Sequence, residues 1–215
     1  MNGRRFLILH GWENHRPVEH WEWWLTDRLR ARGEQVLYPQ LPSPDHPRLD
    51  NWLEAFTAEW RQMGDGERVV VAHSLGCLLW LHAAARGLVD PRADRVLLVA
   101  PPSPIVTREI PDIAGFVAPA DPASVRASSR GTVRLLCSDR DPYSTEGTAA
   151  DAYGTPLALD SEVVPGAGHF TIDDGYGPFP AALTWCLDPP SGPRPPDHVR
   201  MRTFADHPTR GRRIG

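Results

Sequence analysis

Short apolar runs recur along the chain and are separated by stretches with helical spacing of apolar residues. Six runs predict strands, at Phe6–Leu9, Gln35–Tyr38, Arg68–Ala72, Arg95–Ala100, Val133–Cys137 and Ser161–Val164. Continuous apolar runs of this length are typical of strands buried on both faces. Helical patterns fall between them, at His20–Arg32, Leu49–Met63, Leu75–Arg86, about Ser144–Tyr153 and Phe179–Leu187. Because strands and helices alternate, we predict an α/β fold, with a mainly parallel sheet of about six strands and helices on both faces.

The segment 102–132 interrupts this alternation. It is rich in Pro, Ser and Ala, and we expect a long excursion between two strands. Long excursions in compact domains often form lids or binding loops. By position alone, Phe116 and Ile105–Val106 are candidates to line a pocket in this region.

Length and composition favour one domain followed by a tail. The chain has 215 residues, of which 41% are hydrophobic and 23% charged, as in globular proteins. The segment Pro189–Gly215 differs in composition, because it holds six prolines, six Arg and two Asp. Its net charge is therefore about +4, and since the whole chain has −4, the rest of the chain carries −8. Such a segment buries too little apolar surface to offset its ordering entropy. We therefore expect a domain at 1–188 and a disordered tail at 189–215; a basic tail docking on an acidic partner is the alternative.

Several classes of protein are disfavoured by charge and by cysteine content. The chain contains no run of eighteen apolar residues and opens without the apolar stretch of a signal peptide. Three cysteines, Cys77, Cys137 and Cys186, cannot form a fully paired disulfide framework, so we expect a cytoplasmic protein. A net charge of −4 does not favour nucleic acid or a membrane surface as partner.

The third predicted strand is followed by the motif Ala72-His73-Ser74-Leu75-Gly76. A serine on a sharp strand-to-helix turn, flanked two residues away by small residues, forms the nucleophile elbow Gly-x-Ser-x-Gly. Small residues are needed because the chain passes close to itself there, and here Ala72 replaces the first Gly. The amides that open the next helix favour developing negative charge. We predict that Ser74 is a nucleophile; the alternative is a serine that caps an ordinary helix.

A serine hydroxyl needs a base, which in turn is oriented by an acid. The elbow predicts the chain order Ser, acid, His. Asp139 and Asp141 follow the fifth strand, and His169 lies on a Gly-rich loop after the sixth. These loops meet at the carboxyl edge of a parallel sheet. Asp139 lies so close to its strand that it could cap the turn, whereas Pro142 keeps Asp141 extended, so we favour Asp141 as the acid.

The loop after the first strand is the expected source of a second oxyanion donor. It opens with His10-Gly11-Trp12, and Gly11 lets the backbone turn sharply. We predict that the backbone amides of Trp12 and Leu75 form the oxyanion hole. Each such donor is typically worth about 2.7–4 kcal/mol of barrier.

The chain resembles the α/β-hydrolase fold and, within it, the YdeN-like serine hydrolases, relatives of retinoblastoma-binding protein 9. Matching features run through residues 4–188. The elbow and the His loop are shared by all α/β-hydrolases, whereas His20–Leu25 and Gly175–Pro180 are more specific to this family. The resemblance implies Ser74 as nucleophile, Asp141 as acid and His169 as base, without a metal, a cofactor or a large cap domain. Ala72 and the basic tail depart from the family pattern.

Other reactive side chains have simpler interpretations. Cys77 follows the elbow, and a buried structural cysteine is favoured over an alternative nucleophile. His73 is expected to pack beside the elbow. The early histidines lack the spacing of zinc ligands and a convergent Cys or carboxylate, so we expect no metal there. These histidines are His10, His15, His20 and His46.

The function that these residues favour is hydrolysis of a small ester, thioester or amide through an acyl-enzyme, with a small-molecule acyl substrate and no cofactor. One alternative is a non-catalytic protein-interaction module on a hydrolase fold. The nearest match to a Leu-x-Cys-x-Glu motif is Leu135–Asp139, which ends in Asp and falls on a predicted buried strand. The other alternative is an acyltransferase, which would use the same triad with an alcohol or amine as acceptor.

Overall fold

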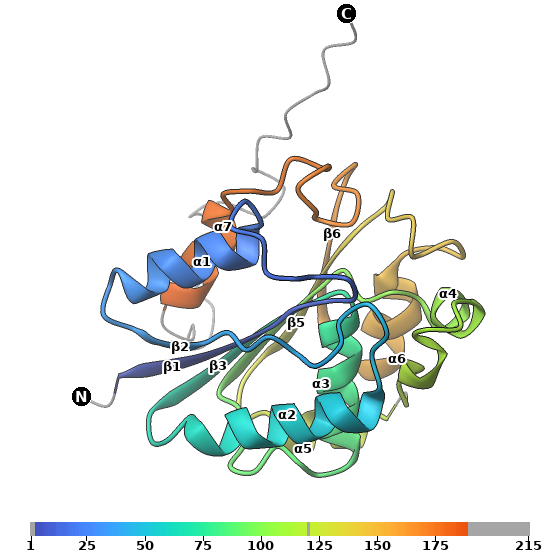
Figure 1. Ribbon diagram of the computed structural model, residues 1–215. Helices are drawn as coiled ribbons and strands as arrows, with labels where there is room; N and C mark the ends of the chain where they lie inside the picture. Colours follow the sequence, from blue (N-terminus) through green and yellow to red (C-terminus); the bar gives the residue numbers. More distant parts are fainter. Residues whose placement is uncertain (1–2, 120, 189–215) are drawn as a thin grey trace, which may run out of the picture.

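The computed structural model describes residues 3–119 and 121–188, and Figure 1 shows one sheet at their centre. All the strand pairs are parallel, in the order β2-β1-β3-β4-β5-β6, so the predicted six-stranded parallel sheet is confirmed. The strands are β1 (Arg4–Leu9), β2 (Gln35–Leu37), β3 (Glu67–His73), β4 (Arg95–Val99), β5 (Val133–Ser138) and β6 (Asp160–Val164). The tail predicted at 189–215 lies outside the described residues.

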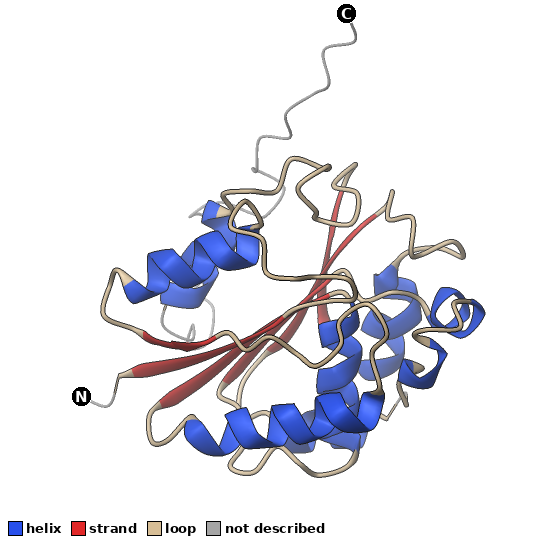
Figure 2. Cartoon of the chain, in the orientation of Figure 1, coloured by secondary structure: helices blue, strands red, loops and turns tan. Residues whose placement is uncertain are grey.

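Helices cover both faces of the sheet, as predicted (Figure 2). Side chains alternate along β1: Phe6 and Ile8 enter the core packed by α1 and α7, and Leu7 and Leu9 enter the core packed by α2 and α3. Both sets are fully buried, which explains why the strand reads as a continuous apolar run. The helices are α1 (Trp21–Arg30), α2 (Leu49–Gln62), α3 (Leu75–Ala85), α4 (Pro104–Glu109), α5 (Pro122–Ser128), α6 (Thr155–Leu157) and α7 (Pro180–Leu187).

The helix predicted at 144–153 is misplaced. The observed helical segment is a π-helical turn, η2 (Ala150–Gly154), that continues into α6. The Asp151 carboxylate accepts hydrogen bonds of 2.8 Å from both the amide and the hydroxyl of Thr148, a capping arrangement that sets the start of the helix. Just before it, Gly147 adopts a φ of +94°, which a continuing helix does not allow.

The excursion at 102–132 is less irregular than its composition indicates. It contains α4, the 3-10 turn η1 (Ala114–Phe116) and α5. Proline begins both α4 and α5, and Ser103 and Asp121 cap them. Phe116 is buried in the core against Trp52 and does not line the cavity described below, and neither do residues 105–106.

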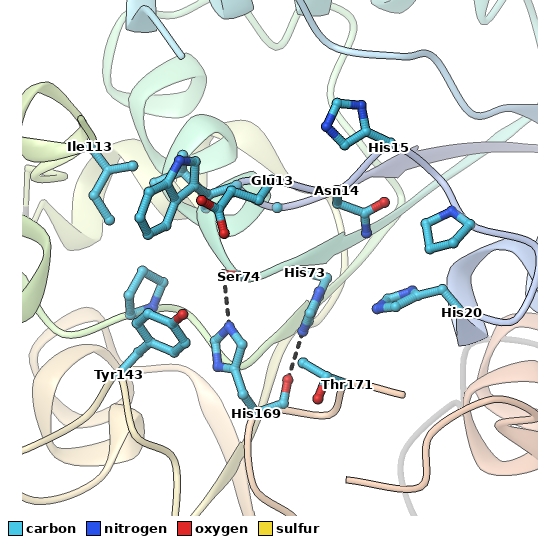
Figure 3. Close-up of a pocket in the computed structure, with 15 residues that line it drawn as sticks. Glu13, Asn14, His15, His20, His73, Ser74, Ile113, Tyr143, His169 and Thr171 are labelled. Atoms are coloured by element: carbon cyan, nitrogen blue, oxygen red, sulfur yellow. Dashed lines mark hydrogen bonds between the residues drawn. The ribbon is translucent and has the colours of Figure 1, made fainter. Parts of the chain in front are cut away.

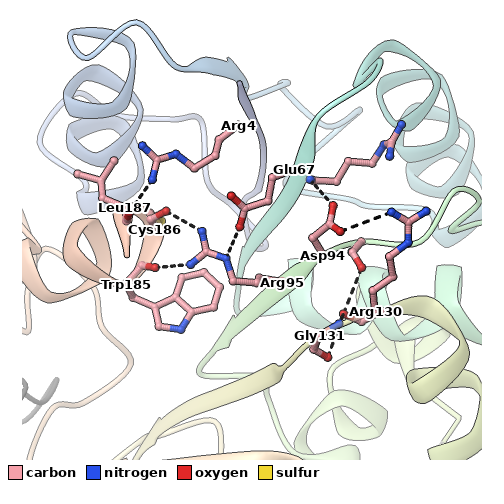
Figure 4. Close-up of polar contacts among 12 residues, drawn as sticks. Arg4, Glu67, Asp94, Arg95, Arg130, Gly131, Trp185, Cys186 and Leu187 are labelled. Atoms are coloured by element: carbon pink, nitrogen blue, oxygen red, sulfur yellow. Dashed lines mark hydrogen bonds and ion pairs between the residues drawn. The ribbon is translucent and has the colours of Figure 1, made fainter. Parts of the chain in front are cut away.

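Two arginines at the amino-terminal edge of the sheet bind the end of α7 (Figure 4). Arg95, the first residue of β4, donates to the carbonyls of Trp185 and Cys186 at 2.7 and 2.9 Å and to the Glu67 carboxylate at 2.6 Å. Arg4 donates to the carbonyl of Leu187. The last carbonyls of a helix have no partner within the helix, so these guanidinium groups satisfy them.

The opposite, carboxyl-terminal edge collects the loops that carry the predicted reactive residues. Within the described residues, no inserted domain covers this edge, and no helix is long and apolar enough to cross a membrane.

Candidate active site

Ser74 is the single residue between β3 and α3, and its backbone has φ +53° and ψ −124°. This is a strained conformation for a residue other than glycine, and its amide donates to the carbonyl of Val99 at 2.9 Å. A Cβ on Gly76 would lie 2.4 Å from the carbonyl oxygen of Leu9, so the turn requires glycine at this position. Ala72 is fully buried in β3, and its methyl group is accommodated in the core.

The three residues predicted as a triad are joined by hydrogen bonds. His169 Nε2 lies 2.9 Å from Ser74 Oγ, and His169 Nδ1 lies 2.9 Å from both carboxylate oxygens of Asp141. The Asp141 side chain is fully buried and the His169 side chain is only 8% exposed. This arrangement can take a proton from the serine hydroxyl and hold the resulting imidazolium against a carboxylate.

Asp139, the competing acid, has a different partner. Its carboxylate accepts the amide of Gly166 at 2.6 Å and so fastens the turn after β6. Asp141 also accepts the amide of Tyr143 at 2.9 Å, which fixes the carboxylate that faces His169. Of the two aspartates, only Asp141 contacts the imidazole of His169.

Two contacts that the sequence reasoning missed, from Asp174 and from His73, hold the His169 loop. The Asp174 carboxylate accepts the amides of His169 and Thr171 at 2.9 and 3.1 Å. It packs so closely on Gly168 that a Cβ there would lie 2.1 Å from an Asp174 oxygen, and Gly168 has φ +62°. His73 donates from Nε2 to the carbonyl of His169 at 2.8 Å. Spacing five residues after the histidine is the one sequence signal that could have indicated Asp174.

The loop after β1 approaches the serine from the other side. A Cβ on Gly11 would lie 2.7 Å from Ser74 Cβ and 3.2 Å from Ser74 Oγ. Trp12 and Leu75, the predicted oxyanion residues, both line the cavity that contains Ser74. Glycine is therefore needed where the loop passes the serine hydroxyl.

Ser74 and His169 line a cavity of about 480 Å³ (Figure 3). Its walls come from the β1–α1 loop, the elbow, the β4–α4 loop and the loops after β5 and β6. Tyr143 stacks obliquely on the His169 ring with 4.5 Å between the ring centroids. Pro102 and Ile113 come from the 102–132 segment, so that segment does contribute to the binding wall.

A buried polar cluster lies behind the reacting groups. His20, Glu22 and His73 place potential metal-ligand atoms within 4.8 Å of one another, so a carboxylate does converge on His20, contrary to the sequence expectation. Because this cluster brings residues of α1 together with a residue of β3, it could not be deduced from the spacing of residues along the chain. Asn14 and Tyr38 donate to Glu22 at 2.9 and 3.4 Å.

Burial governs the protonation of this cluster. Burial raises the pKa of Glu22 well above its usual range and lowers that of His73 well below it. Burial, with smaller contributions from His10 and His169, lowers the pKa of His20 to about 4. The histidines of the cluster are therefore neutral at neutral pH.

Cys77 is buried behind the elbow, as predicted. Its Sγ lies 3.3 Å from the carbonyl oxygens of both Ala72 and Val99, which share its one S–H donor, and burial raises its pKa well above the usual value. A protonated thiol bonded to two carbonyls is a poor nucleophile.

Comparison with known proteins identifies relatives. A family model described as serine hydrolase matches residues 6–186 of this chain. The YdeN hydrolase of Bacillus subtilis (strain 168) is 35% identical over 74 residues, a stretch that covers 34% of this chain and 38% of that protein. The sequence alignment thus spans well under half of the length of YdeN.

Solved structures share the fold over a longer range. The ydeN gene product of B. subtilis matches with a TM-score of 0.67 at 22% identity, covering 85% of this chain and 96% of that one. A YdeN-like hydrolase from Pectobacterium atrosepticum gives 0.66 at 22% identity, covering 85% and 88%. The esterase domain of a Rhodothermus marinus protein gives 0.59 at 16% identity, covering 85% of both chains.

Proposed function

Because the chain belongs to the serine hydrolase family and has the α/β-hydrolase fold, we propose that it hydrolyses a small ester, thioester or amide through an acyl-enzyme on Ser74. The observation that carries this proposal is the continuous hydrogen-bonded path from Ser74 through His169 to the buried Asp141. A small-molecule acyl substrate fits a cavity of about 480 Å³.

In the first half-reaction, Ser74 Oγ attacks the carbonyl carbon while His169 Nε2 takes the hydroxyl proton. The tetrahedral intermediate collapses when the bond to the leaving group breaks, and His169 returns the proton to that group. The acyl-enzyme remains. In the second half-reaction His169 takes a proton from water, the hydroxide attacks the ester, and Ser74 leaves with the proton.

Asp141 and two backbone amides complete the proposed machinery. Asp141 orients the ring of His169 and stabilises the imidazolium that forms in each half-reaction. We assign the oxyanion to the amides of Trp12 and Leu75, on the support of the close approach of Gly11 to Ser74 and of the position of Leu75 as the first residue of α3. The strained backbone of Ser74 is consistent with a nucleophile held ready in place.

The interaction-module alternative has no comparable support. The stretch Leu135–Asp139 that approaches a Leu-x-Cys-x-Glu motif is buried over residues 135–138, on a strand that is paired on both sides. Transfer of the acyl group to an alcohol or amine would differ only in the molecule that attacks the acyl-enzyme.

Labelling with a fluorophosphonate tests the proposal. The wild type is expected to become labelled on Ser74, and Ser74→Ala and His169→Ala are expected to lose labelling. Ser124→Ala, which changes a serine on α5 outside the cavity, is the matched control and is expected to label normally. A wild type that is folded and remains unlabelled would contradict an activated Ser74.

A further inference from the structure

The wall of the cavity opposite His169 has an unbalanced charge. Glu13 is the only carboxylate among the residues that line the cavity, and these residues include no Arg. His15, which also lines it, is hydrogen-bonded to the Asp45 carboxylate at 2.8 Å. Glu13 is therefore the acidic group that the lining offers to a bound molecule.

Glu13 is held at this position by its backbone. It adopts φ +55°, which is unusual for a residue other than glycine, and its amide donates to the carbonyl of Pro44 at 2.9 Å. The neighbouring indole of Trp12 donates to the carbonyl of Asp45 at 3.0 Å. The same loop is thus fixed at two successive residues.

The carboxylate of Glu13 has no hydrogen-bond or ion-pair partner among the described residues. Arg16, on the same loop, donates instead to the carbonyl of Tyr38 and to Gln40, outside the cavity. Figure 3 shows the Glu13 side chain directed into the cavity, toward the part that contains Ser74 and Tyr143. His46, whose pKa Asp112 raises most and Glu13 also helps to raise, makes its hydrogen bond to Asp112, so the Glu13 carboxylate is available to a ligand.

Aromatic rings accompany this carboxylate. Trp12 and Tyr143 both line the cavity. Burial raises the pKa of the Tyr143 phenol, and the charge of Glu13 adds to the effect, so phenol and carboxylate are close enough to interact. Aromatic faces combined with a carboxylate attract organic cations, through the ring quadrupole and through direct charge attraction.

We propose that the substrate carries an ammonium group close to its scissile bond, received by the Glu13 carboxylate and the rings of Trp12 and Tyr143. This inference rests on the proposed role of Ser74. It deepens that role by naming a substrate class: cationic esters, thioesters or amides in preference to neutral ones, with anionic acyl groups disfavoured by the same charge.

A pair of reagents of nearly equal shape, one cationic and one neutral, tests this inference without a known substrate. One is a diethyl phosphorothiolate with a trimethylammonioethyl thiolate leaving group, and the other is its carbon isostere with a 3,3-dimethylbutyl group. In each, the bond from Ser74 Oγ to phosphorus forms as the P–S bond breaks, and the serine proton passes through His169 to the thiolate. The measured quantity is the ratio of the two inactivation rate constants, each divided by the rate constant of the same reagent with hydroxylamine in solution, because the cationic thiolate is the better leaving group. Modification of Ser74 is checked by mass spectrometry.

For the wild type we expect this corrected ratio to favour the cationic reagent about fivefold. The ratio should fall toward one in Glu13→Gln and as salt rises from about 0.05 M to about 0.5 M. Glu19→Gln, a charge change at an exposed position of the same loop outside the cavity, is the control and should keep the wild-type ratio.

The outcomes separate the two proposals. If the neutral reagent modifies Ser74 but the ratio is near one, or if Glu13→Gln keeps the wild-type ratio, the cation site is overturned and the proposed hydrolase function stands. If neither reagent modifies Ser74 in the folded protein, the proposed function fails and the inference fails with it.

Discussion

The two sides of the cavity are held in place by different means. On the reacting side, Ser74, Asp141 and His169 lie just after three strands of one sheet, and their positions follow from the backbone of β3, β5 and β6. The opposite wall is the loop after β1, which has no regular structure. It is tied to the segment before α2 by polar contacts, such as those from Trp12 and Glu13.

This difference separates what the fold dictates from what can vary. The reacting side depends on hydrogen bonds and close backbone crossings that tolerate little change. The wall depends on contacts between two loops, which can be exchanged without disturbing the sheet. We therefore expect substitutions on the reacting side to abolish chemistry or folding, and substitutions on the wall to alter preference.

The largest effect is expected from Asp141→Asn. An amide cannot stabilise the imidazolium, so kcat on an activated ester should fall about 10⁴-fold, with little loss of stability. Asp139→Asn is the matched control, because Asp139 contacts the Gly166 amide and not His169. Equal losses of kcat in the two variants would contradict the assignment of the acid.

The second largest effect, on stability, is expected where the elbow crosses the end of β1 and the loop after it. Gly76→Ala would bring a Cβ to 2.4 Å from the Leu9 carbonyl oxygen, so the free energy of unfolding should fall by about 3 kcal/mol. Gly115→Ala, with nothing within 4 Å, should stay within about 0.5 kcal/mol of the wild type. Urea denaturation measures both, and a stable Gly76→Ala would show that the crossing can relax.

The loop after β1 should make the stability of the protein sensitive to acid, through His10. Its Nε2 accepts the amide of Leu41 at 2.9 Å while Nδ1 lies 2.8 Å from the Gly11 carbonyl oxygen, so the neutral ring is fully bonded. Burial lowers the pKa of His10 from 6.5 to about 4. The unfolded chain therefore binds a proton between these values that the folded protein does not.

It follows that the contribution of His10 to stability is complete above pH 6.5 and is lost as the pH falls toward 4. At pH 5 the loss should be about 2 kcal/mol. The measurement is the free energy of unfolding against pH for the wild type and for His10→Gln, because the comparison removes contributions common to both, including that of Glu22. Parallel curves for the two proteins would refute this assignment.

The smallest effect is expected at Ala72, where the elbow departs from the usual glycine. Ala72→Gly removes a buried methyl group and adds backbone freedom to the unfolded chain, so it should destabilise the protein by about 1 kcal/mol. Fluorophosphonate labelling of Ser74 should persist at a similar rate. A marked gain in labelling would indicate that the methyl group strains the serine.

The same division explains what the sequence could predict. Local sequence patterns predict the strands and the elbow, because parallel strands buried on both faces need continuous apolar runs and a tight turn needs small residues. The sequence therefore indicated all six strands and the loops that carry Ser74, Asp141 and His169. The carboxyl ends of parallel strands bring such loops together whatever their spacing along the chain.

The remaining features depend on contacts between distant segments. Glu22 reaches His73 only because α1 packs on β3, and neither position has a distinctive pattern. The helix after β5 begins where the Asp151 carboxylate accepts the hydroxyl of Thr148. This local side-chain contact sets the start of the helix, and the spacing of apolar residues does not reveal it. Asp174 resembles any exposed loop aspartate until its contacts with the His169 loop are known.

The arginines that hold α7 also bear on the order in which the chain is made. Arg4 and Arg95 leave the ribosome long before the carbonyls of residues 185–187 that they bind. Until those last residues emerge, Arg95, which is 5% exposed in the folded protein, has Glu67 as its remaining partner in that contact. We therefore expect a nascent chain to complete its core only after α7 has been synthesised, and a product that ends before α7 to be a target for proteolysis.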